Sequence, residues 1–274
     1  MAARFRPSKK FVGILFFLLI AVIAATNVAL FWYRNPFSRV VVWLATVGLT
    51  ILLVAVIGLG VNRRPAGAII DSRNRVSLSK LQMIAWTILV LSALMTAGVS
   101  NLFDLFGGTN LRSLLIDIPP ELLAAMGIAA VSLTATPAIL SMKDSQPAGS
   151  AALQSTAGKL GLTADQVSTS GQVFGRTSAD DASWVDIFRG DEVGNAASPD
   201  LSKIQQFLIT LLLLAIYGGD IWSMFASEAT FHALPLLDDK FVWLMGISHA
   251  SYLTYKAAPH SSGQISDPTQ TAAG

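Results

Sequence analysis

Residues 11–33 read FVGILFFLLIAVIAATNVALFWY, a run without a single acidic or basic side chain. A helix of roughly 20 such residues crosses the apolar core of a bilayer, which is about 30 Å thick. Five further stretches are comparably apolar. They are 39–61, 81–103, 119–141, 204–224 and 241–257. The sequence therefore predicts an all-α integral membrane protein with six transmembrane helices.

The composition supports this class and excludes others. Hydrophobic residues make up 53% of the chain and charged residues 13%, whereas soluble domains average about 25% charged residues. A net charge of +2 is too small to indicate a nucleic-acid partner. Because there is no cysteine, disulfides, thiol nucleophiles and cysteine-ligated metals are excluded. The expected partner is the lipid bilayer, with no cofactor.

The distribution of basic residues predicts the orientation. Four precede the first span and five lie between 63 and 80, the loop that joins spans two and three. Loops rich in lysine and arginine stay in the cytoplasm. We therefore expect a protein of the cell (inner) membrane with both termini in the cytoplasm. A cleaved signal peptide would instead leave five spans, but the first apolar run is long for one and ends in the aromatic Phe31-Trp32-Tyr33.

A repeated pattern organises the second half of the chain. LSKLQ at 78–82 recurs as LSKIQ at 201–205, and Met-Gly-Ile occurs at both 126–128 and 245–247. An even number of spans separates the two copies, so the last four helices are predicted to form two tandem parallel two-helix repeats. The boundaries are a hairpin at 1–62, a basic loop at 63–80, and repeats at 81–141 and 201–257.

Two kinds of local signal lie within these repeats. Ser-x-x-Gln before an apolar run is a capping box, which assigns the helix caps to Ser79, Gln82, Ser202 and Gln205. Lys80 and Lys203 are expected to reach toward lipid headgroups.

Small residues four apart allow transmembrane helices to approach closely. Those expected to pack against the other repeat or a second subunit are Ala125, Ala129, Gly246 and Ala250.

The segment at 142–200 loses the apolar pattern and is rich in Ala, Gly, Ser, Thr and Asp. Few bulky apolar residues are present to offset the entropy of ordering, so a flexible acidic cytoplasmic insert is predicted. Within it, an amphipathic helix over about 178–193 would place Trp184, Ile187 and Phe188 on one face, for a partner or the membrane interface. Residues 258–274 are predicted to be a disordered tail.

Ionisable residues inside a membrane are the first candidates for chemistry, and the spans hold two, Asp220 and His249. They would pair only if their helices face each other, and a histidine beside Ser248 more often bonds a neighbouring helix. Ser248 and His249 are adjacent on a helix, so they cannot form a protease dyad. No metal-ligand spacing, nucleotide-binding loop or potassium-filter order is present.

Function follows from these features only as a hypothesis. The sequence favours a non-enzymatic scaffold or anchor that self-associates as a homo-oligomer and docks a cytoplasmic protein partner. The alternative is a channel or transporter subunit for an ion or small solute, in which Asp220, His249, Thr134 and Thr136 line the path.

Overall fold

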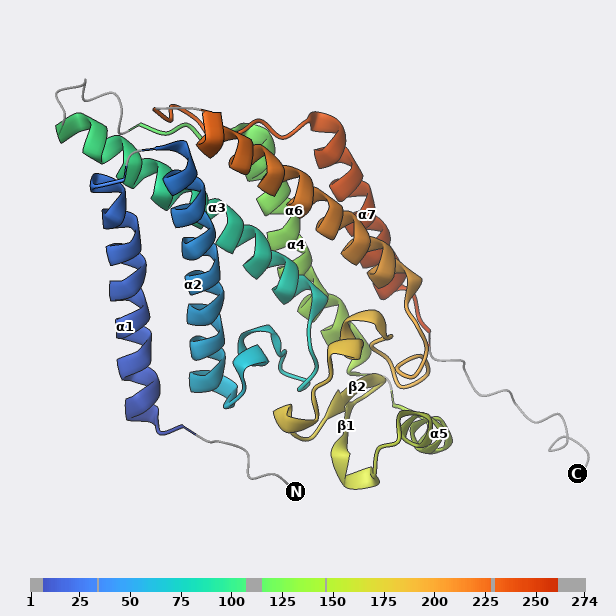
Figure 1. Ribbon diagram of the computed structural model, residues 1–274. Coiled ribbons are helices and arrows are strands. Elements are labelled where there is room, and N and C mark those ends of the chain that lie inside the picture. Colours follow the sequence, from blue (N-terminus) through green and yellow to red (C-terminus); the bar gives the residue numbers. More distant parts are fainter. Residues whose placement is uncertain (1–6, 34, 107–114, 146, 228–229, 261–274) are drawn as a thin grey trace, which may run out of the picture.

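The computed structural model describes residues 7–33, 35–106, 115–145, 147–227 and 230–260. Six long helices and one shorter one carry most of this chain (Figure 1). They are α1 (Lys9–Val28), α2 (Pro36–Asn62), α3 (Leu78–Phe106), α4 (Pro120–Lys143), α5 (Ser150–Leu160), α6 (Leu201–Ser227) and α7 (Asp239–Ala257). Two short 3-10 helices join them, η1 (Ala29–Phe31) and η2 (Pro65–Ile69).

Five of these helices, α1, α2, α3, α4 and α6, are long and apolar enough to cross a membrane. The chain is therefore a multi-pass helical membrane protein, as the apolar runs predict. The last helix, α7, has 19 residues and lies against α4 and α6, but it is less apolar than the other five. Its crossing of the membrane and the tandem repeat remain predictions.

The centre of the bundle is filled by large side chains. Trp86, Leu213, Tyr217, Phe225 and Met245 are all completely buried. The rings of Trp86 and Tyr217 lie 6.0 Å apart between centroids and join α3 to α6. Close packing of this kind holds membrane helices together, because lipid tails are as apolar as the side chains. The bundle interior is thus a packed core.

A buried asparagine ties the N-terminal hairpin to this bundle. Asn27 of α1 donates to Thr46 Oγ1 of α2 at 2.9 Å and accepts from Thr96 Oγ1 of α3 at 3.1 Å. All three side chains are buried. An amide in a membrane interior is stable only when its donors and acceptors are used. Three helices are fixed at one point by this residue.

The segment at 144–200, which we call the polar domain, is folded wherever the structure describes it, so the prediction of a flexible insert is wrong. After α5 come η4 (Ala164–Gln166), a hairpin of β1 (Val167–Ser170) and β2 (Val173–Arg176), then η5 (Ala179–Asp181) and η6 (Trp184–Phe188). Phe174, Val193 and Ala196 are buried together, with Leu153 and Leu160 packed against them. This small apolar core and the buried charges described below order the segment.

The predicted amphipathic helix over 178–193 is replaced by the two short helices η5 and η6. Ala182 and Ser183 between them have extended backbone, with ψ of 134° and 144°. Ser183 then starts a new turn, because its backbone N–H donates to Asp186 Oδ2 at 2.9 Å. The capping box at Ser183 competes with helix continuation here.

The helix caps also differ from those predicted. Both helices begin two residues earlier than predicted, so the cap residues are Ser77 and Asp200. Ser77 Oγ accepts from the N–H of Lys80, and Asp200 Oδ1 accepts from that of Ser202. Ser79 is buried inside the first turn, and Gln205 is exposed. Gln82 donates to Thr210 Oγ1 of α6 at 2.7 Å. The shared pentad therefore serves helix packing more than capping.

Candidate functional site: a buried ion network

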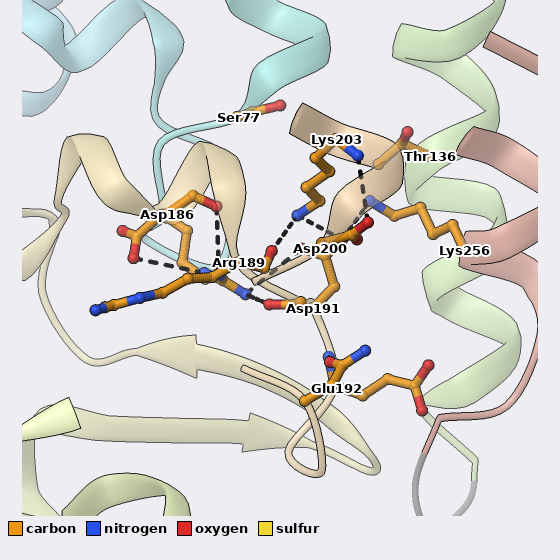
Figure 2. A network of polar contacts seen from close by, with 12 residues as sticks. Ser77, Thr136, Asp186, Arg189, Asp191, Glu192, Asp200, Lys203 and Lys256 are labelled. Atoms are coloured by element: carbon orange, nitrogen blue, oxygen red, sulfur yellow. Dashed lines mark hydrogen bonds and ion pairs between the residues drawn. The ribbon is translucent and has the colours of Figure 1, made fainter. Parts of the chain in front are cut away.

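Four basic side chains surround the carboxylate of Asp191, and Figure 2 labels two of them, Lys203 and Lys256. Lys256 Nζ lies 2.5 Å from this carboxylate, Arg73 Nη1 2.9 Å, Lys203 Nζ 3.0 Å and Arg75 Nη1 3.4 Å. All five side chains are at least four-fifths buried. Asp191 is therefore the centre of a charge cluster that has little access to water.

The basic residues come from three separate parts of the fold. Lys203 is in the first turn of α6. Lys256 is in the last turn of α7, and a positive charge at that end of a helix complements the helix dipole. Arg73 and Arg75 lie in the turn between η2 and α3, which the Ile70–Val76 bridge closes. Asp191 thus fastens the polar domain to α6 and α7 and to the start of α3.

The next residue, Glu192, holds a second group. Lys143 Nζ at the end of α4 donates to Glu192 Oε1 at 2.5 Å, and also to the backbone oxygens of Lys256 and Ala258. The backbone N–H of His260 donates to Glu192 Oε2 at 3.0 Å. One glutamate therefore joins the ends of α4 and α7. Residues 258–260 of the predicted disordered tail are ordered by it, while 261–274 lie outside the described residues.

Asp186 completes the network on the far side of the polar domain. Arg176 Nη2 of β2 lies 2.9 Å from Asp186 Oδ1, and Arg75 Nη1 donates to the backbone oxygen of Gly190 at 2.6 Å. From the end of α2, Arg64 Nη1 donates to the backbone oxygens of Ala179 and Ala182. Helices α2, α3, α4, α6 and α7 are thereby all connected to the domain.

The network sets the protonation of its acids. Burial alone would raise the pKa of Asp191, but the charges of Lys203, Lys256 and the two arginines hold this pKa well below its ordinary value. Burial likewise acts to raise the pKa of Glu192, and the bonds from Lys143 and His260 lower it below its usual value. Both carboxylates are charged at neutral pH, as buried acids with close cationic partners are.

The sign of the pH dependence follows from these depressed pKa values. The stability that Asp191 and Glu192 contribute is fully present above the ordinary carboxylate pKa of about 4, and it is lost as the pH falls below that value. We expect the thermal unfolding midpoint to be nearly constant from pH 7 to about 5 and to drop steeply below about 4. The Asp191→Asn variant should show a smaller drop. Equal drops in both proteins would contradict this role of Asp191.

His249 lies in a separate polar group inside the bundle. Its Nδ1 is 2.5 Å from Ser132 Oγ of α4 and 3.0 Å from Gln206 Nε2 of α6. Asp220 is exposed and lies 14 residues beyond Gln206 on the same helix, about 21 Å along its axis. The two predicted intramembrane candidates therefore do not meet. His249 joins three helices, and Asp220 lies at the opposite end of α6.

The predicted docking residues are divided by the fold. Trp184 is 58% exposed, whereas Ile187 is buried and the ring of Phe188 packs edge-on against Phe207 of α6 at 5.2 Å. Two of the three therefore contact the bundle itself. Of the predicted small packing residues, Ala125 and Ala129 are buried within the bundle, and Ala250 is exposed. A Cβ added to Gly246 would lie 3.7 Å from Ile128, so this glycine packs against α4.

Sequence reasoning missed the acids and bases of the network. Asp191 and Glu192 were counted as part of a solvated acidic segment, and Lys203 was assigned to lipid headgroups. One signal pointed the other way: Lys143, Lys203 and Lys256 end or begin three apolar runs on the same predicted side of the membrane. A segment that lies between such runs and carries paired acids can neutralise them.

Each of the three acids of the cluster, Asp186, Asp191 and Glu192, is paired with at least one basic side chain. Among the residues that the structure describes, no three His, Asp or Glu side chains are grouped to hold a metal ion. The arrangement is suited to fixing the polar domain in place. No family model, curated protein or solved structure matches the chain, so this geometry is the basis for function.

Proposed function

We propose that the protein is a non-enzymatic membrane scaffold that holds a folded domain rigidly against the cytoplasmic face of a membrane. The observation that carries this proposal is the ion network around Asp191 and Glu192. A flexible linker would let the domain move, whereas buried pairs to α4, α6 and α7 fix both its position and its direction. A scaffold that binds a partner protein needs its binding surface to be held in a fixed orientation.

The orientation belongs to the proposal. Helix α1 begins and α7 ends on the side of the polar domain (Figure 1). The basic residues of the loop at 63–80 lie on that side too, and cationic loops stay in the cytoplasm. This arrangement supports our proposal that α7 is the sixth span and that both described ends of the chain lie in the cytoplasm.

Strand β1 is the surface we assign to a cytoplasmic protein partner. Within the described chain β1 pairs only with β2, and Ser168, Thr169 and Ser170 are exposed. An exposed strand edge can accept an extended peptide as a further strand. The buried Ile187 and the partly buried Phe188 are not available for docking, so β1 replaces them in this role.

Self-association is the second part of the proposal, and α7 provides the surface. Trp243 and Ile247 are 72% and 61% exposed, and Ala250 and Thr254 continue the same face at helical spacing. Ala250 is the one predicted packing residue that the bundle leaves accessible. A second copy seated on this face would form a homo-oligomer without disturbing the ion network.

Gentle detergent extraction and mass measurement of the complex test the scaffold. We expect a mass above that of the 29.1 kDa chain and a co-purifying protein that is lost when Thr169→Lys places a charge on the strand edge. The matched control is Ser155→Lys, which adds the same charge on the exposed face of α5. An isolated single chain without a partner would contradict the scaffold.

The channel alternative predicts a different result for His249. Its bonds to Ser132 and Gln206 are the polar contacts that favour a path, but Leu213, Tyr217 and Met245 fill the same bundle. We expect His249→Ala and Asp220→Ala to leave partner binding unchanged, because each of the two interhelical bonds of His249 contributes only about 0.6 kcal/mol and Asp220 is exposed. If reconstituted vesicles conduct an ion or solute and either variant abolishes that conductance, the channel would be favoured.

A further inference from the structure

An apolar groove of about 700 Å³ lies between α2 and α3, and Leu214 of α6 also lines it. Its walls are almost entirely aliphatic. The α2 wall consists of Val47, Ile51, Val54 and Ala55, and the α3 wall of Leu81, Ile84, Ala85, Ile88 and Leu89. In a membrane protein such a groove faces lipid and takes an apolar occupant.

The depth of the groove matches one leaflet of a bilayer. Val47 at its inner end is 15 residues from Asn62, the last residue of α2, or about 22 Å along the helix. Half of the apolar core is about 15 Å thick, and the headgroup region lies beyond it. The groove therefore runs from the middle of the membrane to the headgroup level on the polar-domain side. A partner helix would instead need a groove along the whole span.

The mouth of the groove is polar and cationic. Arg64, Pro65 and Trp184 line it, and the exposed Trp184 has the aromatic character found at membrane interfaces. One guanidinium nitrogen of Arg64 binds the carbonyls of Ala179 and Ala182. Within the described residues no carboxylate forms an ion pair with this side chain. Arg64 therefore supplies a positive charge at the groove that a phosphate would complement.

We infer that this groove binds one anionic phospholipid from the leaflet on the polar-domain side. An acyl chain lies along α2 and α3, and the headgroup phosphate lies at Arg64. Because Arg64 also holds η5 and Trp184 belongs to η6, the lipid contacts both the membrane helices and the polar domain. The inference does not depend on the scaffold proposal.

Native mass spectrometry of the full chain tests this site. The protein is reconstituted with phosphatidylglycerol or with phosphatidylcholine of the same acyl chains, and the retained lipids are counted by mass. We expect one phosphatidylglycerol to remain bound. Ala85→Trp, which fills the groove, should lower its occupancy at least tenfold. The matched control is Ala138→Trp, on an exposed face of α4 outside the groove, and it should retain the lipid.

A second pair of variants tests the headgroup contact. Arg64→Gln removes the charge and should abolish the preference for phosphatidylglycerol, whereas Arg64→Lys keeps the charge and the preference. Three results would overturn the inference: equal retention by Ala85→Trp and Ala138→Trp, equal binding of the two lipids by the unmodified chain, or a lipid-free dimer that Ala85→Trp dissociates. The last result would identify a second copy of the chain as the occupant.

Discussion

Asp191→Asn is expected to lower the free energy of unfolding by about 3–5 kcal/mol, the range for removing one partner of a buried ion pair. Asparagine keeps the shape of the side chain but leaves Arg73, Arg75, Lys203 and Lys256 without their common counter-charge. The lost interactions are the ones that join the polar domain to α6 and α7. The polar domain should therefore separate from the bundle before the membrane helices unfold.

Limited proteolysis in lipid nanodiscs measures this separation directly. Cleavage between residues 144 and 200 should be much faster in Asp191→Asn than in the unmodified protein, while the membrane helices stay protected. Asp165→Asn removes the same charge from an exposed position in the same domain and serves as the control. If both variants were cleaved at the rate of the unmodified protein, the network would not hold the domain.

The second large effect is expected at Gly58, where α2 meets the loop that carries η2. A Cβ at this position would lie 2.5 Å from the backbone oxygen of Pro65 and 2.8 Å from that of Arg64. These are backbone atoms, so they cannot turn away as a flexible side chain would. Gly58→Ala should therefore displace the loop and cost at least the 1–3 kcal/mol or so typical of overpacking.

Gly48→Ala is the matched control, because it lies on the same helix and a Cβ there would meet nothing within 4 Å. Alanine favours the helix over glycine by up to about 1 kcal/mol, so this variant should be neutral or slightly more stable. Thermal unfolding followed by tryptophan fluorescence compares the two. A Gly58→Ala protein as stable as Gly48→Ala would show that α2 and the loop do not touch.

The membrane helices could be predicted from sequence because each residue of an apolar run adds to the signal independently of its partners in the fold. A run such as 11–33 identifies itself by length and apolarity, whatever it packs against. The signal is weaker for α7, where Asp239, Lys240, His249 and Lys256 lower the apolar character, so its crossing of the membrane stays a prediction. Only its contacts with α4 and α6 show where it lies.

The polar domain could not be predicted, because its order comes from partners far away in the sequence. Asp191 is 118 residues from Arg73 and 65 from Lys256, and no local pattern indicates that they meet. Composition alone suggested disorder, since bulky apolar residues are few. Buried ion pairs supply part of the order that an apolar core supplies elsewhere, and they leave no periodic signal in the sequence.

The repeated pentad shows a similar limit. Gln82 is buried in α3, but its counterpart Gln205 is exposed, and the adjacent Gln206 contacts His249 instead. Lys203 is buried in the network, whereas Lys80 donates to the backbone oxygen of Ile70. The two helices thus turn different faces toward the bundle. Sequence similarity identified equivalent helix starts and did not reveal which side chains each helix buries.

Hydrogen exchange in lipid nanodiscs tests most directly whether the polar domain is fixed to the membrane helices. The backbone N–H groups of Phe174, Arg176 and Val193 donate to Asp191, Arg73 and Gln172. We predict that these amides exchange as slowly as those of α3 and α6 at pH 7 and faster in Asp191→Asn. Complete exchange within seconds in the unmodified protein would show that the domain is mobile, and would contradict the scaffold.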